Sequence, residues 1–112
     1  MESKYRVSLS VAKQLKENGF PQDWCDGYWY VNNNNVSQLI RKQHFGKEMD
    51  IYAAPCVGRL GEELPVTCKT FKLNNNIQYC VHEKSTSIVK VANSEADARA
   101  LMWIELKKRG II

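Results

Sequence analysis

Hydrophobic residues recur at helical spacing in the last quarter of the chain, where they form its strongest pattern. A helix is expected over residues 93–110, with Ser94 as its N-cap, acidic residues in its first turn and basic residues in its last. Gly110 suits a left-handed residue after the helix, and Ile111 can then fold back onto the last turn. The apolar face should supply most of the core, through Ala96, Ala100, Leu101, Met102, Trp103 and Ile104.

Two shorter helices are expected nearer the N-terminus. The first covers residues 8–18 and ends, like the C-terminal helix, at a glycine followed by a hydrophobic residue. The second covers residues 56–64, between two prolines. Gly58 and Gly61 each weaken this second helix by roughly 1 kcal/mol relative to alanine. It must therefore depend on packing, or its glycines let it approach another part of the chain closely.

Strands are expected where β-branched and aromatic residues gather between turn residues. These segments are residues 28–31 within the aromatic stretch 24–31, and residues 36–40, 51–54, 66–73, 77–83 and 87–91. Together with the helices they predict an α+β fold: an antiparallel sheet of three to five strands, with the N- and C-terminal helices packed on one face. At 112 residues the chain should form one domain, residues 1–112.

The clearest hairpin joins residues 66–73 to residues 77–83 through three asparagines. A three-residue turn would pair Phe71 with Tyr79. The core-facing side would then carry Phe71, Leu73, Ile77, Tyr79 and Val81, and the other side Cys68, Thr70, Lys72, Gln78, Cys80 and His82. In the next strand, Val89 and Val91 should share one side.

Composition narrows the class of protein. Hydrophobic residues at 44% and charged residues at 25% are typical of a globular domain, and the net charge of +4 is mild. The sequence shows neither a membrane-length apolar run nor a signal-peptide pattern, so a cytoplasmic protein without a membrane partner is expected. The four cysteines form no C-x-x-C pair and should be free thiols.

One candidate site is chemical. In the hairpin register above, Cys68, Cys80 and His82 share a face on adjacent strands, and zinc prefers such sulfur and nitrogen ligands. A fourth ligand could come from Cys25, Cys56 or His44, although nothing in the spacing requires a metal. No catalytic motif accompanies these residues, so we expect no enzyme activity, no cofactor and no small-molecule substrate.

A second candidate site is a nucleic-acid surface formed by a basic loop and the sheet. The order helix, three strands, helix from residue 56 onward also occurs in double-stranded RNA-binding domains, but Glu95 and Asp97 stand where those domains place lysines. The residues assigned to this surface are Arg41, Lys42, His44, Lys47 and Lys72.

The preferred hypothesis is a protein partner or self-association. A small domain with an aromatic-rich strand and one exposed sheet face commonly joins an assembly through that face. The sequence therefore favours a non-enzymatic interaction domain over a nucleic-acid-binding module, and places a metal site third.

Four stretches of the chain resemble a group of small proteins from bacterial phages, prophages and mobile elements. They are SLSVAKQLKENGFPQ at residues 8–22, IYAAP at 51–55, LGEELP at 60–65 and EADARALMWIEL at 95–106. The match covers about half of the chain in the right order, although Cys56 stands where threonine is usual in the group. The resemblance implies a phage or prophage origin and a location in the cytoplasm of a bacterial or phage-infected cell. It implies no particular activity.

Overall fold

The computed structural model describes residues 4–23, 25–32, 34–41, 50–73 and 78–112. In chain order they form α1 (Leu9–Glu17), β1 (Gly27–Val31), β2 (Ser37–Arg41), β3 (Asp50–Ala53), α2 (Val57–Glu63), β4 (Cys68–Lys72), β5 (Tyr79–Glu83), β6 (Val89–Ala92) and α3 (Glu95–Lys108). The α+β class and both terminal helices expected from the sequence are confirmed. Within these ranges, no helix is both long and apolar enough to cross a bilayer.

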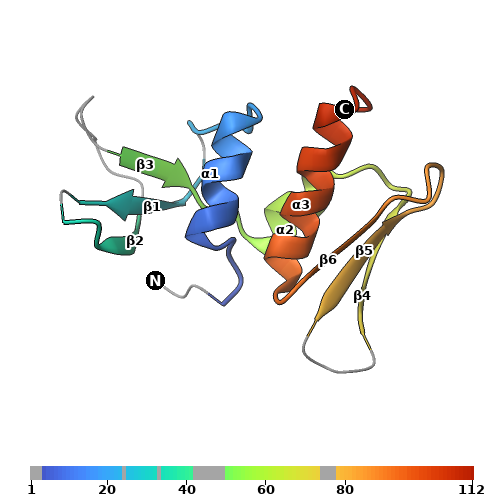
Figure 1. The fold of residues 1–112 in the computed structure, drawn as a ribbon, viewed down its shortest axis with the longest axis horizontal. Coiled ribbons are helices and arrows are strands. Elements are labelled where there is room, and N and C mark those ends of the chain that lie inside the picture. Colours follow the sequence, from blue (N-terminus) through green and yellow to red (C-terminus); the bar gives the residue numbers. More distant parts are fainter. Residues whose placement is uncertain (1–3, 24, 33, 42–49, 74–77) are drawn as a thin grey trace.

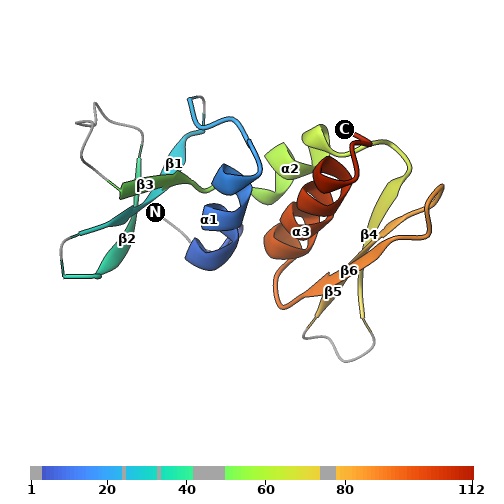
Figure 2. The same ribbon diagram turned by 45° about the horizontal axis from the view of Figure 1, so that its top comes forward.

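The six strands form two separate antiparallel sheets, one on each side of the helices (Figures 1 and 2). The first sheet has the order β2-β1-β3 and contacts α1 through β3. The second has the order β4-β5-β6 and contacts α3 through β5 and β6. Because α2 and the contacting pair α1 and α3 lie between the two sets of strands, these sets do not join edge to edge into the single sheet expected.

The core is centred on α3, which packs against α1, α2 and the second sheet. Its buried residues therefore occupy more than one face of the helix. The ring of Trp103 meets that of Phe20 edge to face, with centroids 5.0 Å apart, and this contact joins α3 to the end of α1. The buried residues of α3 are Ala96, Ala98, Ala100, Met102, Trp103, Ile104 and Leu106.

The first turns of α1 and α3 are each capped by a serine, of which Ser94 is the one predicted above, and they are also joined to each other. The Ser94 hydroxyl accepts a hydrogen bond from the Asp97 amide at 3.1 Å, and the Ser8 hydroxyl accepts one from Val11 at 3.4 Å. The Asp97 carboxylate accepts a hydrogen bond from the Ser8 amide at 2.8 Å, so this side chain joins the start of α3 to the start of α1.

The last turns of α1 and α3 end in the same motif. Gly19 and Gly110 have φ of +85° and +72°, a conformation that favours glycine. The Ile111 amide donates to the Leu106 carbonyl at 2.9 Å, and Phe20 makes the equivalent bond at the end of α1. The predicted ends of both helices are therefore confirmed.

Arg99 of α3 joins α2 to the second sheet. Its guanidinium donates to the Val57 carbonyl at 2.6 Å and to the Thr70 hydroxyl at 3.1 Å. A Cβ atom on Gly61 would lie only 2.7 Å from Arg99 Nη1, whereas one on Gly58 would meet nothing within 4 Å. Of the two glycines in α2, Gly61 is the one that provides a close approach, and its neighbour is a side chain.

Candidate interaction surface on the second sheet

The pairing of β4 with β5 decides which side chains reach the surface of the second sheet. Phe71 lies opposite Cys80 and not opposite Tyr79, so the predicted register is wrong by one residue. The Leu73 amide donates to the Gln78 carbonyl at 2.9 Å, and this pairing leaves one more residue between the strands than the expected three-residue turn. The turn itself lies outside the described residues. Because side chains alternate between faces, a shift of one residue exchanges the two faces of β4 relative to β5.

The inner face of the second sheet packs against α3. Val81 at its centre is completely buried, and Cys68 and Tyr79 pack against the same core. Lys90 extends from this face to Glu105 of α3, with Nζ 2.9 Å from the carboxylate. The inner face consists of Cys68, Thr70, Lys72, Tyr79, Val81, Glu83, Lys90 and Ala92.

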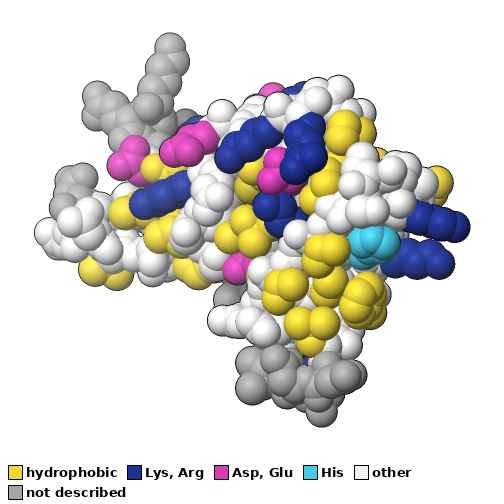
Figure 3. All heavy atoms as spheres, turned by 45° about the vertical axis from the view of Figure 1, so that its right-hand side comes forward, with side chains coloured by type: hydrophobic (Ala, Val, Ile, Leu, Met, Phe, Trp, Pro, Cys, Tyr) yellow, Lys and Arg dark blue, Asp and Glu magenta, His cyan; other side chains and the backbone are white. Residues whose placement is uncertain are grey.

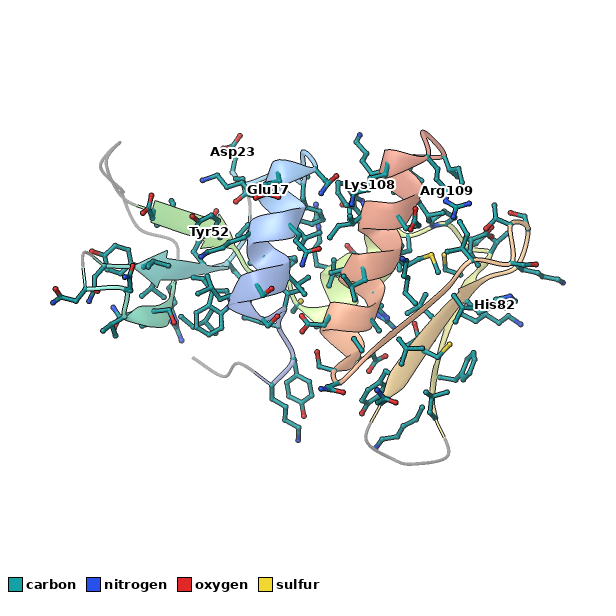
Figure 4. The ribbon with its side chains drawn as sticks, in the orientation of Figure 1. Glu17, Asp23, Tyr52, His82, Lys108 and Arg109 are labelled. Atoms are coloured by element: carbon teal, nitrogen blue, oxygen red, sulfur yellow. The ribbon has the colours of Figure 1, made fainter. Side chains whose placement is uncertain are left out.

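The outer face of the second sheet carries two rows of side chains that run across its three strands. One row is Phe71, Cys80 and Val91, and the other is Lys69, His82 and Val89. Phe71, Val89 and Val91 are 49%, 50% and 42% exposed. Figure 3 shows hydrophobic side chains gathered beside a histidine, and Figure 4 shows His82 pointing away from α3. These six residues are called the outer face below.

Cys80 occupies the centre of the outer face but is only 4% exposed. Its small side chain lies between the larger side chains of Phe71 and Val91 on the neighbouring strands. Burial raises the pKa of the Cys80 thiol, so this group stays protonated at neutral pH. The centre of the outer face is therefore an apolar surface and does not present a thiolate.

The charges near the outer face are positive. Lys69 is exposed within it. Lys84 extends the β4–β5 ladder by one pair, because its amide donates to the Thr67 carbonyl at 3.1 Å, and strand alternation then puts its side chain on the same side. Neither lysine has an ion-pair partner among the described residues, whereas Lys90 on the opposite side is paired with Glu105.

A buried carboxylate fixes the turn that leads into β6. Glu83 accepts hydrogen bonds from the Ser85 hydroxyl at 2.6 Å and amide at 3.0 Å, and from the Thr86 hydroxyl and amide, each at 2.8 Å. These bonds, first among them that of the Ser85 hydroxyl, hold the pKa of Glu83 far below its usual range. The carboxylate thus fixes the turn between β5 and β6, the strand that carries Val89 and Val91 of the outer face.

The predicted metal ligands do not come together. Cys68 lies opposite Glu83 on the inner face, while Cys80 and His82 lie on the outer face. The expectation that all three share a face is wrong, because it depended on the incorrect hairpin register. The described part of the chain holds no group of three or more histidine, cysteine or acidic residues placed to bind a metal ion.

The predicted nucleic-acid residues are divided between the two sheets. Arg41 ends β2 in the first sheet, and Lys72 ends β4 in the second sheet, on the other side of the helices (Figure 1). The Lys72 ammonium lies 5.5 Å from the centre of the Tyr79 ring, on the inner side. Lys42, His44 and Lys47 lie outside the described residues.

Two hollows of about 370 Å³ open elsewhere on the surface. One lies at the start of α3, between Lys72 and the N-terminal segment. The other is lined by Cys25, Cys56 and residues of α2. Neither hollow contains a histidine that could serve as a base beside a cysteine nucleophile, in the part of the chain that the structure describes.

The sequence carries one direct signal for the outer face, and it lies in β6, outside the β4–β5 hairpin. Val89 and Val91 lie on either side of Lys90 in β6, and they share one side of the sheet as predicted. Their partners on β5 then follow from strand pairing alone. The missing information was the length of the β4–β5 turn, which decides whether Phe71 joins them.

The fold and this surface define a small α+β protein with an uncovered, apolar and positively charged sheet face. Comparison of the chain with protein-family models, with curated proteins and with solved structures finds no match.

Proposed function

We propose that this chain is a non-enzymatic protein-interaction domain and that the outer face is its docking surface. The observation that carries the proposal is the placement of Phe71, Val89 and Val91, three half-exposed apolar side chains in adjacent rows of one sheet. Apolar side chains gathered on one face in this way mark interaction sites more often than scattered ones do. In keeping with the resemblance in its sequence, the domain would act as a phage or prophage accessory protein in the cytoplasm of a bacterial cell.

Nucleic acid is the second candidate for the outer face, and the composition of the face makes it the weaker one. Surfaces that bind single strands stack successive bases on aromatic rings. The outer face offers only two rings, those of Phe71 and His82, and its two valines offer no ring to a base. A protein segment, in contrast, can pack aliphatic side chains against both valines.

The proposal is tested by quantitative affinity capture from the cells that carry the gene. The tagged wild-type chain is compared with a Phe71→Ser/Val91→Ser double variant and with a Val36→Ser control. Val36 is 58% exposed and precedes β2 in the first sheet, so the control removes an exposed valine away from the outer face. Captured proteins are quantified by mass spectrometry, and captured RNA and DNA by sequencing.

The proposal predicts at least one protein that the wild type and the control capture equally and that the double variant loses. Identical protein profiles for all three chains would contradict it. If the double variant loses captured nucleic acid but no captured protein, the outer face binds nucleic acid instead.

A further inference from the structure

The dimensions of the outer face limit the size of its occupant. β4 and β5 have five residues each, and β6 has four. With strands about 4.8 Å apart and a rise of about 3.4 Å per residue, three strands of this length offer a footprint on the order of 250 Å². A stable dimer buries about 800 Å² on each partner, so the outer face alone is too small for one. It is large enough for a single strand or for one side of a helix.

The charge on this side of the sheet limits the chemistry of the occupant. Lys69 and Lys84 are exposed and have no carboxylate partner among the described residues, and His82 lies between them on β5. The outer face itself contains no aspartate or glutamate. Two copies packed through this face about a two-fold axis would bring lysines together without an anion to pair with them. Charge complementarity therefore favours a different molecule that brings carboxylates.

Several cations elsewhere are paired with carboxylates of the chain. Arg99 is paired with Glu95 at 3.0 Å, Lys90 with Glu105 at 2.9 Å, and Arg6 with Asp26 at 2.8 Å. The carboxylates near the second sheet are already engaged: Glu83 by the turn before β6, Glu105 by Lys90 and Arg109, and Glu95 by Arg99. Among the described residues, these carboxylates near the sheet are therefore not available to pair with Lys69 and Lys84.

We infer that the outer face binds a single acidic segment of another protein, in which apolar side chains alternate with or flank aspartate or glutamate. The apolar residues would pack over Phe71, Val89 and Val91, and the carboxylates would pair with Lys69 and Lys84. This inference rests on the proposed function, which it deepens by naming the kind of partner. It excludes a second copy of the chain as the occupant of the face.

Selection from a displayed library of random 12-residue peptides tests the inference directly. The full chain is immobilised, and peptides that also bind the Phe71→Ser/Val91→Ser variant are removed. The binding of enriched peptides is then measured by fluorescence anisotropy against two double charge reversals. One is Lys69→Glu/Lys84→Glu, and the other is Lys13→Glu/Lys108→Glu, whose exposed lysines lie on α1 and α3. Both variants change the net charge by the same amount.

The inference predicts enriched peptides that combine acidic with aromatic or aliphatic residues. Their affinity should fall about tenfold or more with the reversal at Lys69 and Lys84, and much less with the matched reversal, because only the first removes local charge pairing. Neutral or basic peptides, equal effects of the two reversals, or no enrichment over the variant would each overturn it. None of these results would contradict a partner found by affinity capture. The acidic-segment inference can therefore fail while the proposed docking function still holds.

Discussion

The fourteen strand residues of the second sheet are divided between two faces, which differ in what covers them. On the inner face, Val81 is completely buried and the charges of Lys90 and Glu83 are satisfied within the chain. On the outer face, Phe71 and Val91 are about half exposed, and Lys69 has no anionic partner in the described residues. The inner face therefore stabilises the fold, while the outer face leaves both apolar area and charge for another molecule.

The contrast between the inner and outer faces shows that hydrophobic residues in a strand do not by themselves identify a core. Val81 and Val91 lie on neighbouring strands and belong to the same residue type, yet one is covered by α3 and the other is not. The two valines should therefore contribute differently to the free energy of unfolding, and matched substitutions on the two faces measure that difference.

The largest expected effect comes from placing the same charge on each face. Val81→Asp buries an uncompensated carboxylate and should cost about 4 kcal/mol or more, enough to unfold much of a marginally stable domain. Val91→Asp should change the free energy of unfolding by about 1 kcal/mol or less, since its side chain reaches solvent. Urea denaturation followed by circular dichroism measures both, and equal losses would contradict the assignment of faces.

The next effect depends on pH and concerns Glu83. Its pKa is lowered in the folded state from the ordinary 4.5, so its stabilising effect is complete above about pH 4.5 and is lost progressively as the pH falls below that value. Glu83→Gln removes this dependence and should lower the Tm by roughly 5–10 °C at pH 7.

The gap in Tm between the wild type and Glu83→Gln should then narrow steadily between pH 5 and pH 2.5 in thermal melts. Glu105, whose pKa is lowered mainly by Lys90, titrates in the same direction but is present in both chains. A gap that stays constant over this range would show that the Glu83 carboxylate is not held in its charged form by the turn.

A smaller effect distinguishes the two glycines of α2. Gly58→Ala meets no atom and should stabilise the chain by up to about 1 kcal/mol through helix propensity. Gly61→Ala must displace the Arg99 guanidinium from its bonds to Val57 and Thr70, and should lose that gain or destabilise by about 1 kcal/mol. Chemical denaturation of the two variants gives the difference, and an equal gain for both would mean that Arg99 moves without cost.

The smallest expected effect on stability is that of Phe71→Ser. Because Phe71 is 49% exposed and lies away from α3, its removal should shift the Tm by only a few degrees while abolishing partner capture. Differential scanning calorimetry of this variant separates a role in docking from a role in folding. A loss as large as that of Val81→Asp would assign Phe71 to the core.

The helices could be predicted closely from the sequence because their signals are local. Ser94 and Gly110 mark the two ends of α3 within a few residues of the positions they control, and the structure confirms both. The division of the strands into two sheets could not be predicted in this way, because it depends on packing among α1, α2 and α3 over long sequence distances.

The outer face could not be predicted from the sequence because the predicted register between β4 and β5 is wrong by one residue. Periodicity predicts that Phe71 alternates with its neighbours in β4, but it does not say whether Cys80 or Tyr79 lies opposite. The length of the turn decides that pairing, and asparagine-rich turns of three and of four residues share the same composition. The same error paired Cys68 with His82 and so predicted a metal site. In the structure Cys68 lies opposite Glu83, and this site does not form.

The most direct test of the outer face is site-specific photo-crosslinking in the cells that carry the gene. The crosslinking amino acid p-benzoyl-phenylalanine replaces Phe71 in one chain and Val36 in a control, and adducts are identified by mass spectrometry. We predict a discrete adduct with another protein from position 71, through an acidic segment, and no such adduct from position 36. Adducts only with a second copy of the chain, or the same adducts from both positions, would contradict the account.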